Sequence, residues 1–162
     1  MSTWPEFVAQ APTIATVFTR RHRATGDLCL LATLRSDGYP RISPMEPRIF
    51  EDQLWLSGMP HTTKFDDLQR DPRFCLHTAT VDPQVTDGDA KLWGVALEAS
   101  NDLLRRRFAT DLFEESGFDL RGQEFALFGI DITGGSAVQI SDRHLDITVW
   151  TPGQPERVVR KH

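Results

Sequence analysis

The sequence predicts one α+β domain, a β-barrel of short strands with three helices on its outside. Many short apolar runs are separated by turn signals, and three longer segments carry apolar residues near helical spacing. The chain has 162 residues, of which 40% are hydrophobic, so it can bury one core without disulfides or a metal. We expect a single domain over residues 1–162, with an N-terminal helix within 1–24, the barrel over 27–150 and a tail over 151–162.

Capping residues mark the predicted helices, which are residues 3–23, 61–70 and 102 to about 115. Thr3 can cap the first helix, and Pro5 suits its first turn. Asp71-Pro72 stops the second helix, and Asn101 or Asp102 caps the third.

The predicted strands are residues 27–35, 39–50, 53–57, 74–78, 91–99, 124–132, 136–140 and 145–150. Ser36-Asp37-Gly38 predicts a hairpin between the first two, and Glu51-Asp52 a tight turn before the third. Gly134-Gly135 predicts a turn between 124–132 and 136–140, and the polar residues 79–90 predict a loop.

Pro40, Pro44 and Pro47 interrupt the second predicted strand. Prolines in a strand require an edge, a bulge or a barrel corner. Three of them indicate a backbone left unpaired, which faces something other than a neighbouring strand.

Charge and composition exclude several classes of protein. The chain has 18 Lys and Arg residues against 23 Asp and Glu, a net charge of -5, which disfavours nucleic-acid binding. Cys29 and Cys75 lie in apolar runs and predict buried, reduced thiols. No signal-peptide pattern and no apolar run of about 18 residues is present, so we expect a cytoplasmic protein without membrane contact.

The segment from Leu56 to Leu68 carries the clearest candidate site. A predicted strand ends at Ser57-Gly58, and Thr62-Thr63-Lys64 then open a helix. Two hydroxyls, an ammonium and free backbone N–H groups would meet at one helix N-terminus, which suits a phosphate. The alternative is that a threonine only caps the helix and Lys64 is solvated.

Two stretches, LLATLRSDGYPRISPM and LWLSGMPHTTKFDDLQRDPRFCLH, resemble the pyridoxamine 5′-phosphate oxidase-like family of flavin- or deazaflavin-binding split barrels. The likeness is tight over about residues 28–78 and continues loosely through 92–96. It implies an antiparallel split barrel of six or seven strands, and a homodimer that holds each cofactor between its subunits.

The resemblance implies a phosphate site. Lys64 matches the family's phosphate-binding lysine, and Thr62 matches a serine that touches the same phosphate. Thr63 stands where the oxidases carry an arginine, so one charge is missing. Arg48 matches a second basic residue of that site.

The resemblance also implies a ring site on the proline-rich strand. Arg41, Ser43, Pro44 and Met45 lie on the strand that faces the ring system, and Ser57 lies on the strand beside it. Ser43 takes the place of another oxidase arginine.

The C-terminal part departs from the oxidases that make pyridoxal phosphate. Arg143-His144-Leu145-Asp146 lacks their closing motif, which argues against pyridoxamine phosphate as substrate. The ending over 149–153 is closer to uncharacterised relatives of the actinobacterial type, many of which use a deazaflavin. The implied cofactor is therefore FMN, with the deazaflavin coenzyme F420 as the alternative.

Two functions remain open. The first is a flavin- or deazaflavin-dependent oxidoreductase that transfers hydride to or from a small conjugated substrate, without an obvious acid or base. The second is a non-catalytic binder or carrier of a flavin, deazaflavin or tetrapyrrole.

Two further patterns carry little chemistry. Cys75 and His77 share a strand face, but His61 is the only further ligand close in sequence, so no metal site is predicted. Arg105-Arg106-Arg107 fans over three directions of a helix. That spread favours a solvated face, and an anion-receptive rim for a coenzyme with an acidic tail is the alternative.

Overall fold

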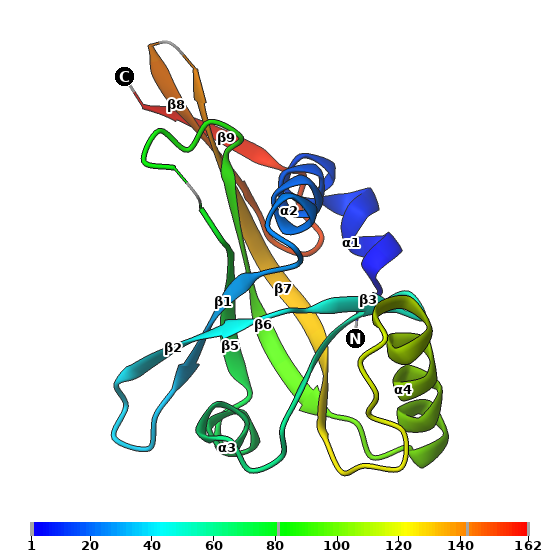
Figure 1. The fold of residues 1–162 in the computed structure, drawn as a ribbon. Coiled ribbons are helices and arrows are strands. Elements are labelled where there is room, and N and C mark those ends of the chain that lie inside the picture. Colours follow the sequence, from blue (N-terminus) through cyan, green and yellow to red (C-terminus); the bar gives the residue numbers. More distant parts are fainter. Residues whose placement is uncertain (1, 81, 142, 162) are drawn as a thin grey trace.

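The computed structural model describes residues 2–80, 82–141 and 143–161. Within these ranges the chain forms four helices: α1 (Trp4–Gln10), α2 (Pro12–Ala24), α3 (Thr63–Arg70) and α4 (Asp102–Ser116). The same ranges contain nine strands: β1 (Cys29–Leu34), β2 (Pro40–Met45), β3 (Arg48–Phe50), β4 (Gln53–Gly58), β5 (Arg73–Thr78), β6 (Asp89–Glu98), β7 (Ala126–Ser141), β8 (His144–Trp150) and β9 (Arg157–Lys161). The predicted α+β class is confirmed, with more strands than the six or seven that the family resemblance implies (Figure 1).

All strand pairs are antiparallel, in the order β2-β1-β5-β6-β7-β4-β3, and β8 lies between β7 and β9. The two ends of this order, β2 and β3, follow each other in the chain. Glu46-Pro47 therefore joins the two edges of the sheet and curls it into an incomplete barrel.

The proline-rich strand is divided. The sequence predicts one strand over 39–50, whereas the structure has β2 and β3 on either side of Glu46-Pro47. Both pieces are edge strands on the path, as prolines require. The carbonyl of Pro47 lies 2.8 Å from Nε2 of buried His22, so Nε2 donates and ties α2 to this corner.

The single helix predicted over residues 3–23 is wrong in one respect: it is two helices. Ala11, with φ -131° and ψ 59°, separates α1 from α2. Pro12 causes the break, because its ring disfavours helical geometry at the preceding residue. Thr3 caps α1 as predicted, in a reciprocal capping box with Glu6.

The turn predicted at Gly134-Gly135 is also wrong, because β7 runs straight through it. A Cβ at Gly134 would lie 2.3 Å from Nε1 of Trp93 on β6. This glycine leaves space for the indole of the neighbouring strand, and the register shift between Trp93 and Gly94 marks the same place.

The segment expected as a tail also differs from the prediction. Residues 157–161 form β9, which pairs with β8 from Leu145↔Lys161 to Val149↔Arg157. Figure 1 shows the connection between β8 and β9 beside α1 and α2, where Glu156 accepts hydrogen bonds from the N–H groups of Thr13 and Ile14. The Arg and Lys side chains of β9 suit an edge strand, since charge discourages further pairing.

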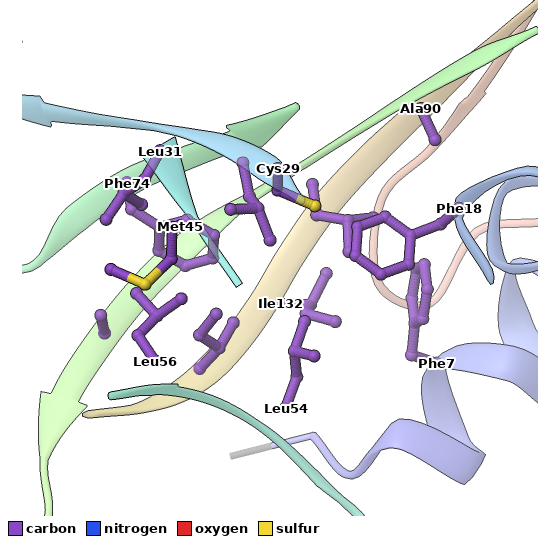
Figure 2. Packing of buried hydrophobic residues seen from close by; sticks show 14 of the residues in the cluster. Phe7, Phe18, Cys29, Leu31, Met45, Leu54, Leu56, Phe74, Ala90 and Ile132 are labelled. Carbon is purple, nitrogen blue, oxygen red and sulfur yellow. The ribbon is translucent and has the colours of Figure 1, made fainter. Parts of the chain in front are cut away.

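The core lies between the sheet and the first two helices. Figure 2 shows Phe7 and Phe18 reaching toward the strand residues Leu54 and Ile132. A second, smaller cluster around Phe108 holds α4 against β3, β4 and β7. Each such buried side chain stabilises the fold by about 1.5–3 kcal/mol.

Candidate functional site

The predicted phosphate turn lies between β4 and α3. His61 has φ 57°, and Thr62 is the extended N-cap residue of α3. The Thr62 side chain does not cap the helix, because its Oγ1 donates instead to the Met59 carbonyl at 3.3 Å. Within the described residues, the N–H groups of Thr63 and Lys64 therefore have no acceptor.

Lys64 is half-buried beside these free donors. Its Nζ lies 5.7 Å from the centroid of the Phe65 ring, and no carboxylate of the described ranges forms an ion pair with it. Phe65 stacks on Phe128 at 5.3 Å and lies against Gly58, where a Cβ would come within 3.0 Å of the ring. Packing thus fixes the turn, and its donor set fits an anion despite the exposed Asp66 in the first turn.

Arg41 reaches α3 from β2. Its Nε donates to Oδ2 of Asp67 at 2.7 Å, and Thr33 donates to the same oxygen at 2.9 Å. Arg70 donates to Oδ1 of Asp67 at 3.0 Å. Burial alone would raise the pKa of Asp67, but the hydrogen bonds from these three partners outweigh it and lower the pKa.

Arg48, the second predicted basic residue, is engaged by α4. Its guanidinium lies 2.8 Å from Asp111 and 2.5 Å from Glu115. Burial alone would lower the pKa of Arg48. The hydrogen bonds and charges of the two carboxylates outweigh burial, so the pKa is raised. A phosphate at Arg48 would compete with these two carboxylates, and the Glu115 side chain, which is 66% exposed, can leave more easily than Asp111, which is 35% exposed.

The predicted ring residues of β2 divide between its two faces. Arg41 and Ser43 are half-buried, Pro44 is exposed on the opposite side, and the Met45 side chain is 2% exposed in the core. Met45 can therefore contact a ligand through its backbone but not through its side chain. Because β2 pairs with β1 alone, one side of its backbone has no strand partner.

Ser57 lines a groove of 690 Å³. One wall is the β4–α3 connection, Ser57 to Pro60. The other wall, from α4 and the loop after it, is mainly apolar, and Glu46 lines the groove as well. This wall consists of Leu112, Phe118, Leu120, Gln123, Glu124 and Phe125. None of the site residues predicted from the sequence lies on this wall. Phe118 and Leu120 just after the helix were a signal, since apolar side chains in a polar turn segment often line a site.

The two cysteines are not among the residues that line this groove, whereas His61 follows the lining residue Pro60 and its Nε2 lies 3.7 Å from Oε1 of Glu124 in the lining. Both thiols are free, and burial raises the pKa of Cys29 to about 12. In the part of the chain that the structure describes, no three His, Cys, Asp or Glu side chains gather as a metal site would require. None of the described helices is both long and apolar enough to span a bilayer.

Comparisons with known proteins agree with this architecture. The family model described as pyridoxamine 5′-phosphate oxidase matches residues 18–143. No curated protein matches the sequence. A pyridoxamine 5′-phosphate oxidase-related, FMN-binding protein from Nostoc punctiforme is similar in structure, with a TM-score of 0.70 and 15% identity over 94% of this chain and 96% of that one.

Two further solved structures share the fold. A heme binding protein from Mycobacterium smegmatis has a TM-score of 0.63 and 21% identity over 88% of this chain and 56% of that one. PhzG from Burkholderia lata, in complex with tetrahydrophenazine-1-carboxylic acid, has a TM-score of 0.62 and 13% identity over 96% of each chain. The predicted antiparallel split barrel is thereby confirmed.

Proposed function

Because the chain belongs to the pyridoxamine 5′-phosphate oxidase family of split barrels, we propose that it binds FMN or coenzyme F420 and acts as an oxidoreductase on a small conjugated substrate. The first turn of α3 is the observation that carries this proposal. It offers the free N–H groups of Thr63 and Lys64 together with an unpaired ammonium. An anion gains from such donors and from the positive end of the helix dipole.

Each residue of the turn has a role toward the phosphate. The ammonium of Lys64 donates a charge-assisted hydrogen bond, and the hydroxyl of Thr63 adds a neutral donor. The Thr62 hydroxyl joins them by giving up its hydrogen bond to the Met59 carbonyl. Arg48 joins as the second cation when Glu115 moves away. This exchange compensates for the arginine that Thr63 replaces.

The ring is placed against the edge of β2 and the groove beside Ser57. Unpaired backbone groups around Arg41, Ser43, Pro44 and Met45 hydrogen-bond the ring edge, and the Ser57 hydroxyl adds a polar contact. The apolar far wall of the groove excludes water. When bound, the coenzyme supplies the hydride transfer, which no side chain of the chain can perform.

The proposal includes a homodimer in the cytoplasm. The outer face of β1 and β2 exposes Leu30 to 41% and Ile42 to 70%. These side chains give a second subunit an apolar surface to cover. Two free thiols suit a reducing compartment.

Coenzyme binding is tested with the purified protein in three titrations, of FMN, of riboflavin and of F420. We expect FMN or F420 to bind at least tenfold more tightly than riboflavin, which lacks the phosphate. Equal affinity for FMN and riboflavin would contradict the phosphate site. Protein purified from a host that makes both coenzymes then reveals the native one by its absorbance spectrum.

A carrier function is the second candidate, and one observation favours it. The groove is mainly apolar and Met59 at its mouth is 76% exposed, which suits a large flat ligand such as a tetrapyrrole. Reduced coenzyme offered with a panel of quinones, enones and biliverdin separates the two. Turnover supports the oxidoreductase, whereas tight coenzyme or haem binding without turnover supports the carrier.

A further inference from the structure

A second cavity, of 510 Å³, lies between α4 and the loop that follows it. Asp102, Arg105, Arg106, Ala109 and Thr110 line one side. Their spacing of three and four residues places them on a single face of the helix. The opposite side comes from residues 120–123 and 125.

Arg105 is held rigidly at this cavity. Its guanidinium donates to the backbone carbonyl of Ala99 at 3.1 Å and to that of Phe125, and it lies 4.6 Å from the centroid of the Phe125 ring. Two carbonyls and a ring fix its position without neutralising its charge. Three of its five N–H groups remain for a ligand.

The other arginines near the cavity differ in whether their guanidinium groups are already paired. Arg106 is exposed, and no side chain of the described ranges pairs with it. Arg121 binds Asp119 through two hydrogen bonds and stacks 3.6 Å from the centroid of Phe113. Arg107 points elsewhere, to Glu51. The run therefore does not simply fan out, because Arg105 and Arg106 share one cavity.

The net charge of the cavity is positive. Its lining holds Arg105, Arg106 and Arg121 against one carboxylate, that of Asp102. Asp119 cancels the charge of Arg121 from outside the lining, so one excess cation remains. Arginine recognises carboxylates well, since its planar fork matches the two oxygens.

The cavity adjoins the groove proposed for the ring. The two share Leu120, Gln123 and Phe125 as a common wall. A ligand that occupies the groove can therefore extend a charged group past this wall to the arginines.

We propose that Arg105 and Arg106 form a binding site for the carboxylate of an organic anion. The inference deepens the proposed function and rests on it for the body of the ligand, which lies in the adjoining groove. Two sources supply the same chemistry: a carboxylate on the substrate, or the acidic tail of the coenzyme.

The site is tested without any coenzyme, by titrating benzoate and its neutral isostere benzamide into ¹⁵N-labelled protein. We expect benzoate to shift the Nε–H signals of Arg105 and Arg106 and the amides of Gly122 and Gln123. Benzamide should leave them in place. Arg106→Ala should weaken benzoate binding at least fivefold, and Arg107→Ala, its matched control on the same helix, less than twofold.

Equal shifts with both compounds, or equal losses in the two variants, would overturn the carboxylate site. Either result would leave the test of FMN against riboflavin untouched, so the two proposals can fail separately. Titrations with F420 and with F420 that lacks its acidic tail distinguish the two sources of the carboxylate. A loss in Arg106→Ala confined to the tailed form identifies the tail, and unchanged affinity for both forms identifies the substrate.

Discussion

Oδ2 of Asp67 in α3 accepts a hydrogen bond from Nε of Arg41 in β2 at 2.7 Å. A residue predicted from sequence to bind cofactor thus also fastens the proposed phosphate-binding helix to the sheet. The Asp67 side chain is 4% exposed and that of Arg41 is 30% exposed, so water screens this pair only in part.

Asp67→Asn should destabilise the fold by about 1–3 kcal/mol, because it weakens three hydrogen bonds to a buried group. Urea unfolding measures the loss. Asp66→Asn is the matched control on the exposed side of the same turn, and it should cost at most about 1 kcal/mol. Equal losses in both variants would show that the contact of Asp67 with Arg41 contributes nothing specific.

The same carboxylate makes stability depend on pH. The pKa of Asp67 in the folded protein lies below its ordinary value of 3.8. A lowered pKa means that its contribution is complete above about pH 5 and is lost as the pH falls through the folded pKa. Between about pH 5 and 2.5 the wild type should therefore lose more stability than Asp67→Asn. Parallel pH profiles of the two proteins would contradict this assignment.

Lys64→Ala should weaken FMN binding by about 1.5–3 kcal/mol, because it removes a charge-assisted contact to the phosphate. That is about a tenfold to hundredfold rise in Kd. Riboflavin binding should not change, since it has no phosphate. Lys161→Ala, at an exposed position of β9, is the control for loss of a positive charge. An unchanged FMN affinity in Lys64→Ala would contradict the assignment of the phosphate site to this turn.

Glu115→Gln should tighten FMN binding about two- to fivefold, because it frees Arg48 from one of two competing carboxylates. Glu114→Gln, its exposed neighbour, removes the same charge at a position that does not pair with Arg48. If both variants tighten binding equally, the gain reflects net charge alone, and Arg48 is not part of the phosphate site.

Local signals predicted the helix ends well. The box of Thr3 with Glu6 and the double cap by Asn101 both form as short-range chemistry requires. Pro12 is a signal of the same kind, because it disfavours helical geometry at Ala11 and so divides the segment predicted as one helix. Such features depend on neighbours in the chain and can be found from it.

Features that depend on distant neighbours were missed. Gly134 resembled a turn residue, and only the indole of Trp93 across the sheet explains it as part of a strand. The groove beside Ser57 is likewise assembled from segments some 50 to 70 residues apart, and only Phe118 and Leu120 give a local sign of its apolar wall. The pairing of Arg48 with Asp111 was hidden for the same reason, although both residue types were visible.

Gly94→Ala should destabilise the protein by about 3 kcal/mol or more, because the new methyl group would lie 1.9 Å from the carbonyl oxygen of Asp131 in the neighbouring strand. Backbone cannot yield there without breaking the β6–β7 ladder. Gly134→Ala meets a side chain instead, the Trp93 indole at 2.3 Å, which can shift at a smaller cost of about 1–2 kcal/mol. Thermal unfolding of both variants tests which one loses more stability. A larger loss of stability in Gly134→Ala than in Gly94→Ala would contradict the prediction.

Ile42→Asp should convert the proposed homodimer to a monomer, because it places a charge on the outer face that a second subunit would cover. The free energy of unfolding of the monomer should change by about 0.5 kcal/mol or less, since Ile42 is 70% exposed. Light scattering after size exclusion gives the mass, and Tyr39→Asp, 69% exposed in the adjacent hairpin turn, is the matched control. A dimeric mass for wild type and Tyr39→Asp but not for Ile42→Asp supports this face as the interface. A monomeric wild type would contradict the dimer itself, and a dimeric Ile42→Asp would move the interface elsewhere.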